Sequence, residues 1–240
     1  MPHLFTNRPR KFNLSSKAPA GHRHFSWEVV NSAIYLIGGA TFFAGSIFFF
    51  PQFEQYADWG AWIFFVGSLL YLIVTLHDMG EALLYKRTQH KFTRYYGLEL
   101  SAAVAYIIGT LLFAVGSLLF LSMIGMEAAG GWCFIIGSGL FLMGAFVNVT
   151  QIIDETSKLS LQLVNATAIS FALGSIIFLF ASVPYLWPAF TKQDARKLFE
   201  FVAWQFTVGS VLFMAGGVFN AWRSYSAMRY HRAHRSASES

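Results

Sequence analysis

Residues 132–148 read WCFIIGSGLFLMGAFVN, a stretch without a charged side chain. The stretch belongs to an apolar run over residues 132–153. A helix of about 22 residues spans about 33 Å, which matches a hydrocarbon core of about 30 Å. The run does not alternate between apolar and polar residues, as a strand of a membrane barrel would. We therefore expect it to form a helix that crosses a membrane.

Five further runs have the length of a membrane span: residues 29–50, 59–76, 100–124, 161–183 and 199–222. The whole chain is 55% hydrophobic and 12% charged, whereas soluble domains are about 25% charged. Pro51 and Pro184 follow the first and fifth runs, where a residue without a backbone donor can end a helix. These features predict an all-α polytopic membrane protein with six transmembrane helices.

A repeat relates the second, fourth and sixth runs. The pattern Trp-x-Phe-x-(Val or Ile)-Gly-Ser occupies residues 62–68, 132–138 and 204–210. The odd-numbered runs repeat as well, at Tyr35-Gly38-Phe42-Ser46, Tyr106-Gly109-Phe113-Ser117 and Phe171-Gly174-Phe178-Ser182. The repeating unit is therefore a two-helix hairpin, present three times in tandem. We expect an N-tail over residues 1–26, hairpins over 27–95, 96–158 and 159–223, and a C-tail over 224–240.

The packing of the hairpins follows from their orientation. Each hairpin crosses the membrane twice, so all three copies have the same orientation, unlike the inverted repeats of many secondary transporters. A pseudo-threefold bundle is the simplest packing of three such units. Small residues must supply the close contacts in lipid, and we expect Gly67, Gly137 and Gly209 to lie at helix contacts, with Trp62, Trp132 and Trp204 pointing elsewhere.

The distribution of Lys and Arg predicts the topology. Five lie in the basic N-tail, four in the expected loop over residues 77–97 and four at the C-terminal end, whereas the other side has only Lys192, Arg196 and Lys197. The positive-inside rule then places both termini in the cytoplasm of a multi-pass protein of the cell membrane. Residues 185–197, with Trp187 and Phe190, are expected to form a short amphipathic segment at the outer interface or against a partner. The basic residues form no dense patch, so we expect no nucleic-acid partner.

No catalytic or metal-binding constellation is evident in the sequence. The serines of the repeat follow small residues with no nearby His or Lys to activate them. Cys133 is the only cysteine and the histidines lie mostly in the tails. We therefore expect no enzyme activity, no metal and no cofactor.

Two polar positions recur at the inner ends of the hairpins. Asp78, Asn148 and Asn220 each stand eleven residues after the repeat glycine, and Glu28 and Glu99 stand at helix starts. One interpretation is that these side chains cap helices, favour the helix dipole or snorkel at the interface. The other is an inner polar layer that binds an ion, a headgroup or a partner. The sequence leaves both open.

The first hairpin resembles the YrhK-like domain, a two-helix membrane unit of unknown function. The resemblance rests on the entry Trp27-Glu28-x-x-Asn31, on Gly45-Ser46 and Gly67-Ser68, and on Pro51. The second copy keeps Glu99 and both Gly-Ser pairs, and the resemblance covers most of residues 27–223. It implies a fold but no activity and no binding residues.

Two functions remain. A scaffold or accessory subunit of a membrane assembly is favoured by the 26 phenylalanines and by the absence of charge at mid-bilayer; its partners would be lipid, other membrane proteins or further copies of the chain. The alternative is a small pore or carrier for an ion or small polar solute. Its lining would be Thr41, Thr110, Ser170, Gln205 and Thr207, if these converge on a central axis.

Overall fold

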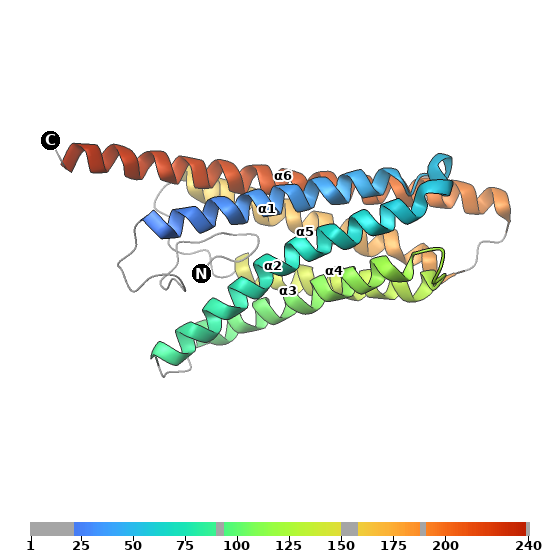
Figure 1. The fold of residues 1–240 in the computed structure, drawn as a ribbon, viewed down its shortest axis with the longest axis horizontal. Coiled ribbons are helices and arrows are strands. Elements are labelled where there is room, and N and C mark those ends of the chain that lie inside the picture. Colours follow the sequence, from blue (N-terminus) through green and yellow to red (C-terminus); the bar gives the residue numbers. More distant parts are fainter. Residues whose placement is uncertain (1–21, 90–93, 150–157, 188–190, 239–240) are drawn as a thin grey trace.

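The computed structural model describes residues 22–89, 94–149, 158–187 and 191–238. Within these ranges the chain is helical and contains no strand (Figure 1). The long helices are α1 (His22–Ile47), α2 (Ala57–Gln89), α3 (Arg94–Leu119), α4 (Glu127–Val149), α5 (Lys158–Ser182) and α6 (Lys192–Ser238). Short 3-10 helices, η1 (Pro51–Tyr56) and η2 (Val183–Leu186), begin at or beside the two expected helix-ending prolines.

The described residues include six helical segments that are long and apolar enough to cross a membrane, two of which include η1 or η2. They are Val29–Ile47, Pro51–Gly80, Gly97–Leu119, Glu127–Val149, Lys158–Leu186 and Lys192–Ser226. The all-α class and the six predicted spans are therefore confirmed, and the chain is a multi-pass membrane protein.

The sequence-based helix ends need correction. Most of the expected loop over residues 77–97 is helical, because α2 continues to Gln89 and α3 begins at Arg94. The C-tail is helical to Ser238, and residues 192–197 form the first turns of α6 rather than a separate amphipathic segment. Hydropathy predicts where a helix leaves the hydrocarbon region of the membrane. Good helix formers, such as those of Glu81–Lys86, continue the helix beyond that point.

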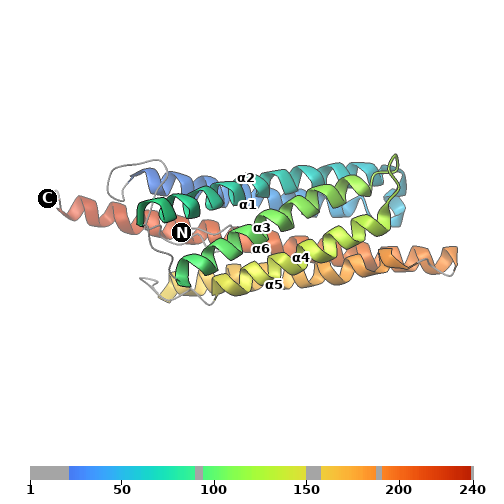
Figure 2. The same ribbon diagram turned by 90° about the horizontal axis from the view of Figure 1, so that it is seen from below.

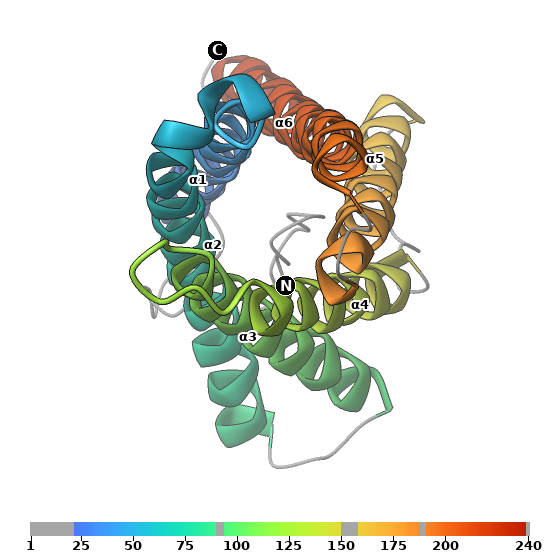
Figure 3. The same ribbon diagram turned by 90° about the vertical axis from the view of Figure 1, so that its right-hand side faces the viewer.

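The helices form a closed ring. Each packs against its neighbours in the sequence, and α6 returns to pack against α1. The end-on view in Figure 3 shows this order around the ring, and Figure 2 shows the helices running along the long axis of the molecule.

One polar contact joins the first hairpin to the turn of the second. The Asp58 carboxylate accepts hydrogen bonds from the backbone N–H of Ser122, at 2.7 Å, and from its hydroxyl, at 2.6 Å. In the same turn Gly125 has φ of +67°, a conformation that costs other residues about 1–2 kcal/mol. The turn therefore depends on glycine at this position.

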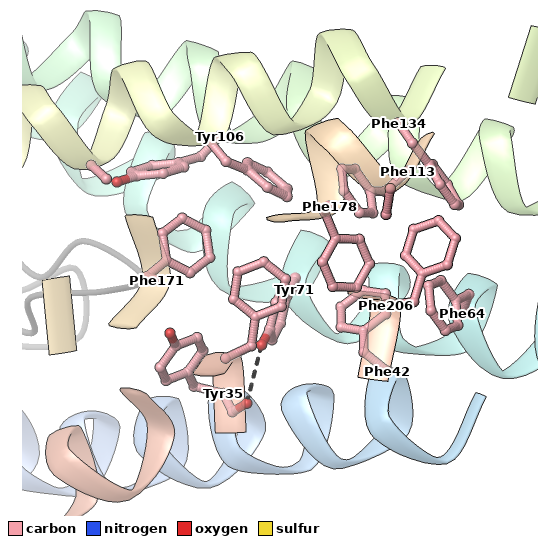
Figure 4. Packing of buried hydrophobic residues seen from close by; sticks show 14 of the residues in the cluster. Tyr35, Phe42, Phe64, Tyr71, Tyr106, Phe113, Phe134, Phe171, Phe178 and Phe206 are labelled. Atoms are coloured by element: carbon pink, nitrogen blue, oxygen red, sulfur yellow. Dashed lines mark hydrogen bonds between the residues drawn. The ribbon is translucent and has the colours of Figure 1, made fainter. Parts of the chain in front are cut away.

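Aromatic side chains fill the interior of the helical bundle (Figure 4). Phe42, Phe113 and Phe178 stand at equivalent positions of α1, α3 and α5, and their ring centroids lie 6.1, 6.1 and 5.8 Å apart. Each of the three side chains is at most 1% exposed. Three helices on different sides of the bundle thus meet through one layer of rings.

The even-numbered helices contribute a second layer. Phe64, Phe134 and Phe206, from α2, α4 and α6, have centroids 6.1, 6.2 and 6.1 Å apart. This second layer contacts the first layer, because the rings of Phe113 and Phe134 stack with their centroids 4.8 Å apart.

Further aromatic layers lie on either side of these two. Phe49, Phe120 and Tyr185 pack beyond the second layer. On the side of the termini follow two layers, made by Tyr71, Phe141 and Phe213 and by Tyr35, Tyr106 and Phe171. The axis is therefore packed with rings along much of its length.

Glycines of the neighbouring helices make room for these rings. A Cβ at Gly137 would lie 2.7 Å from the ring of Phe113, and one at Gly209 would lie 2.6 Å from the ring of Phe178. A Cβ at Gly67 would overlap the Thr41 hydroxyl and would lie 3.5 Å from the ring of Phe42. The expectation that these three glycines lie at helix contacts is confirmed.

The tryptophans of the repeat lie on the opposite side of their helices. Trp62, Trp132 and Trp204 are 46%, 55% and 56% exposed. They face the surroundings of the bundle rather than its aromatic axis.

We predict that Gly137→Leu destabilises the fold by more than the usual ~1–3 kcal/mol of overpacking, because the new side chain overlaps Phe113 and the α3 backbone. Trp132→Leu, which removes an exposed ring, should be mild. Thermal unfolding in detergent, followed by circular dichroism, measures both. Equal tolerance of the two substitutions would contradict this packing.

Candidate functional site

Polar side chains gather inside the bundle at the end where the termini lie. These residues are buried, because each is at most 7% exposed, unlike a residue at the membrane interface. We call this set the terminal polar layer: Asn31, Asp78, Glu99, Asn148, Asn220 and Arg223. It lies next to the aromatic layer of Tyr35, Tyr106 and Phe171.

Asn148 fixes the position of the layer relative to the rings. It stands four residues after Gly144, which leaves room for the ring of Tyr106. The Asn148 Nδ2 donates a hydrogen bond to the Tyr106 hydroxyl at 2.8 Å. The amide thus lies directly beyond the hydroxyl, within the second hairpin.

Asp78 of α2 lies near Tyr106, and Asn31 of α1 lies near Tyr35. Asp78 lies close enough to Tyr106 for an electrostatic interaction between the two side chains. Asn31 precedes Tyr35 by four residues, one helical turn, and so shares its face of α1. The Tyr71 hydroxyl donates to the Tyr35 carbonyl at 3.4 Å (Figure 4). The first hairpin therefore brings a carboxylate and an amide to the layer.

Asn220 enters the layer from α6. Gly216, one turn earlier, faces the Tyr35 hydroxyl, which would lie 2.7 Å from a Cβ at that position. One turn later the Ser224 and Ser32 hydroxyls hydrogen-bond at 3.1 Å. Asn220 lies between these two contacts with α1, and it is 1% exposed. Its side chain is thus enclosed by the bundle.

Within the part of the chain that the structure describes, the Asn220 amide has no hydrogen-bond partner at either Nδ2 or Oδ1. The sequence explains this. In the second hairpin Asn148 meets Tyr106, but the corresponding residue of the third hairpin is Phe171, which has no hydroxyl. The third hairpin therefore keeps the asparagine but lacks the tyrosine hydroxyl that accepts its hydrogen bond in the second hairpin.

Four of the five candidate residues are buried: Asp78, Glu99, Asn148 and Asn220. Burial disfavours snorkelling of these side chains to water, and the binding of an ion, a headgroup or a partner by the polar layer stays a prediction. The side chain of Glu28 lies outside the described residues.

Two members of the layer, Asn31 and Arg223, were not predicted as site residues from the sequence. Asn31 could have been recognised by its spacing of four residues from Tyr35. Arg223 was counted only as a topology signal, although it is 6% exposed. Asp78, Glu99 and Arg223 are thus charged residue types buried at one end of the bundle, a burial that the sequence patterns did not predict.

Hydroxyl groups along the helices mostly bond to their own backbone. Thr41, Thr110 and Thr207 donate to the carbonyls of Gly38, Tyr106 and Ala203. Of the remaining expected pore-lining residues, Ser170 is buried and Gln205 half-buried. Because aromatic rings occupy the axis between the helices, these side chains do not form a continuous polar lining.

The repeat serines behave in the same way. Ser46, Ser68, Ser117, Ser182 and Ser210 each donate to a carbonyl three or four residues earlier. The Ser138 hydroxyl is buried and has no hydrogen-bond partner among the described residues. Within the described ranges no group of three or more His, Cys, Asp or Glu side chains could hold a metal ion.

Six apolar helices around an aromatic axis define a helical multi-pass membrane protein. A family profile described as YrhK-like protein matches residues 26–83 and 97–153, which fall on α1 and α2 and on α3 and α4. These two segments are therefore YrhK-like repeats, as the sequence resemblance indicated, whereas the match does not extend to residues 159–223, which the resemblance was expected to include. No curated protein and no solved structure matches the chain.

We predict that Tyr106→Phe destabilises the protein by about 1–3 kcal/mol, because it removes the hydroxyl that accepts from the buried Asn148 amide. Adding Asn148→Leu should recover part of this loss, since no amide is then left unsatisfied. Denaturant unfolding of both single variants and the double variant measures the coupling.

Tyr71→Phe is the matched control, because its hydroxyl makes only a 3.4 Å contact. If Tyr106→Phe costs no more than this control, the Asn148 contact does not stabilise the layer.

Proposed function

We propose that this protein is a non-enzymatic scaffold or accessory subunit of a membrane assembly, with a closed axis. The packing of aromatic rings along the axis carries the proposal, because it leaves no polar path between the two ends of the bundle. The unknown function of the family is compatible with such a role.

The chemistry of the bundle supports a role without catalysis. A serine nucleophile needs a neighbouring base, whereas five of the six repeat serines use their hydroxyls to bond the backbone of their own helix. These hydroxyls act in helix packing, as is common for serine in membrane helices.

We further propose that the three hairpins form a pseudo-threefold unit. The nearly equal spacings within the Phe42, Phe113 and Phe178 layer support this. The third hairpin also repeats the contacts of the second, since Gly174 faces Phe213 as Gly109 faces Phe141. A unit of this kind offers three similar outer faces to lipid and to partners.

The alternative function, a pore or carrier, is tested by flux. The full chain reconstituted in liposomes should pass Na⁺, K⁺ and small neutral solutes no faster than protein-free liposomes, because the rings would have to separate to open a path. Flux above that background would support the pore and contradict the closed axis.

A scaffold should also bind a partner through an accessible surface. The first turns of α6 expose Lys192, Arg196 and Lys197 at the end away from the termini. We expect Arg196→Glu with Lys197→Glu to weaken co-purification of a membrane partner while membrane insertion is kept. Glu54→Lys, another exposed charge reversal near that end, is the control that should leave association unchanged.

We propose that both termini lie in the cytoplasm of a cell-membrane protein, on the basis of the Lys and Arg distribution. In a Cys133→Ala background, single cysteines at Glu54, Glu127 and Gln193 should react with an impermeant reagent added outside intact cells. A cysteine in the C-tail should react only after lysis. The opposite labelling pattern would reverse the topology.

A further inference from the structure

The first turns of α6 carry a cluster of cations at the end of the bundle away from the termini, where α6 extends beyond the other helices (Figure 1). Lys192, Arg196 and Lys197 lie there, and all three are exposed. Among the described residues at that end no other Lys or Arg occurs. The positive-inside rule explains basic residues at the opposite end but predicts few here. This cluster therefore needs an explanation other than topology.

The repeat shows that the cations are particular to the third hairpin. Arg196 and Lys197 stand eight and seven residues before the repeat tryptophan, Trp204. The residues at the same distances before the other two repeat tryptophans are Glu54 and Gln55 in the first hairpin and Ile124 and Gly125 in the second. The two cations are thus a local departure from the repeat, and the shared fold does not require them.

The neighbouring carboxylates do not neutralise these cations. Asp194 is engaged at the helix start, where it accepts a hydrogen bond from the Thr191 hydroxyl at 2.6 Å. Glu200, one turn after Arg196, is half-buried, and within the described ranges it forms no ion pair with Arg196 or Lys197. The guanidinium and the ammonium group are therefore available to an anion from outside the chain.

An apolar stripe continues along α6 from Lys197. Phe201, Trp204 and Val208 follow at steps of four, three and four residues, which keeps them on one face of the helix. They are 61%, 56% and 47% exposed. Trp204 also packs edge-to-face on Phe50, which follows α1, with ring centroids 5.2 Å apart. The stripe is therefore continuous with the lipid-facing surface of the bundle, beside α1.

The depth of the cations matches that of lipid phosphates. The apolar run of α6 begins at Phe199, so Arg196 and Lys197 lie about 3–5 Å beyond it along the helix. The headgroup region is about 5–8 Å thick on each side of the hydrocarbon core. Phosphate is the anion that a bilayer supplies at this depth, and both guanidinium and ammonium groups bind it.

We propose that this part of α6 binds one anionic phospholipid. Its phosphate would lie between Arg196 and Lys197. One acyl chain would lie along Phe201, Trp204 and Val208. A lipid with a net negative charge fits better than a zwitterionic one, because the ammonium group of a zwitterionic headgroup adds positive charge beside the two cations. The site goes beyond the scaffold role, since it concerns a lipid rather than a protein partner.

The test measures which lipid lies against the stripe. The purified full chain with Cys133→Ala and Val208→Cys carries a bimane fluorophore at position 208 and is reconstituted in phosphatidylcholine vesicles. Phosphatidylglycerol or phosphatidylcholine with a nitroxide on the acyl chain is added in equal amounts, and fluorescence quenching gives their relative affinities. We expect phosphatidylglycerol to bind at least about fivefold more tightly, because two cations face its charge.

Position 136 is the matched control. Ile136 is the equivalent of Val208 in the second hairpin and is 49% exposed, but no cation lies before it at the corresponding positions. Ile136→Cys should therefore report nearly equal affinities. The preference at position 208 should disappear in Arg196→Gln with Lys197→Gln, whose exposed side chains make no contact with the core. It should persist in Lys158→Gln, which removes an exposed cation at the other end.

Equal affinities for the two lipids at position 208, or a preference that survives the double substitution, would overturn the site. Weak quenching by both lipids at position 208, with strong quenching at position 136, would also overturn it, because a second copy of the chain would then cover the stripe. The vesicles contain no other protein, so each of these results leaves the proposed scaffold role to its own co-purification test.

Discussion

The structure depends on the packing of aromatic rings against glycines of the neighbouring helix. Lipid tails are as apolar as the helix surfaces, so apolar burial alone does not drive these helices together, and close contact must replace it. At Gly109, Gly137, Gly174 and Gly209 the absence of a Cβ lets a phenylalanine ring reach the facing helix. Two of these rings, Phe113 and Phe178, then meet each other and Phe42 at the axis.

This packing has two consequences for function. Aromatic rings fill much of the axis, which supports the proposed closed bundle over a channel. The buried amides and charged side chains gather at one end of the aromatic layers, where Asn148 and Asn220 follow the last rings. The difference between Tyr106 and Phe171 then makes one of these amides unlike the other, which a strictly repeated structure would not allow.

The sequence predicted the spans and the interior glycines well, because both follow from helical periodicity. Trp132 and Gly137 recur with their equivalents at fixed spacing, and the structure places the former outside and the latter inside. Helix ends were predicted poorly, since α2 runs to Gln89 beyond the apolar run. Burial at the inner end was not predicted either. The same Asp or Asn can lie at an interface or inside a bundle, and only the packing of α6 against α1 encloses Asn220.

A crystal structure determined from a lipid mesophase tests the central claim most directly. The rings of Phe42, Phe113 and Phe178 should meet on the axis, each against a glycine of a neighbouring helix, with no ordered water between this layer and that of Phe64, Phe134 and Phe206. A continuous file of water along the axis, with these rings turned toward lipid, would contradict the account.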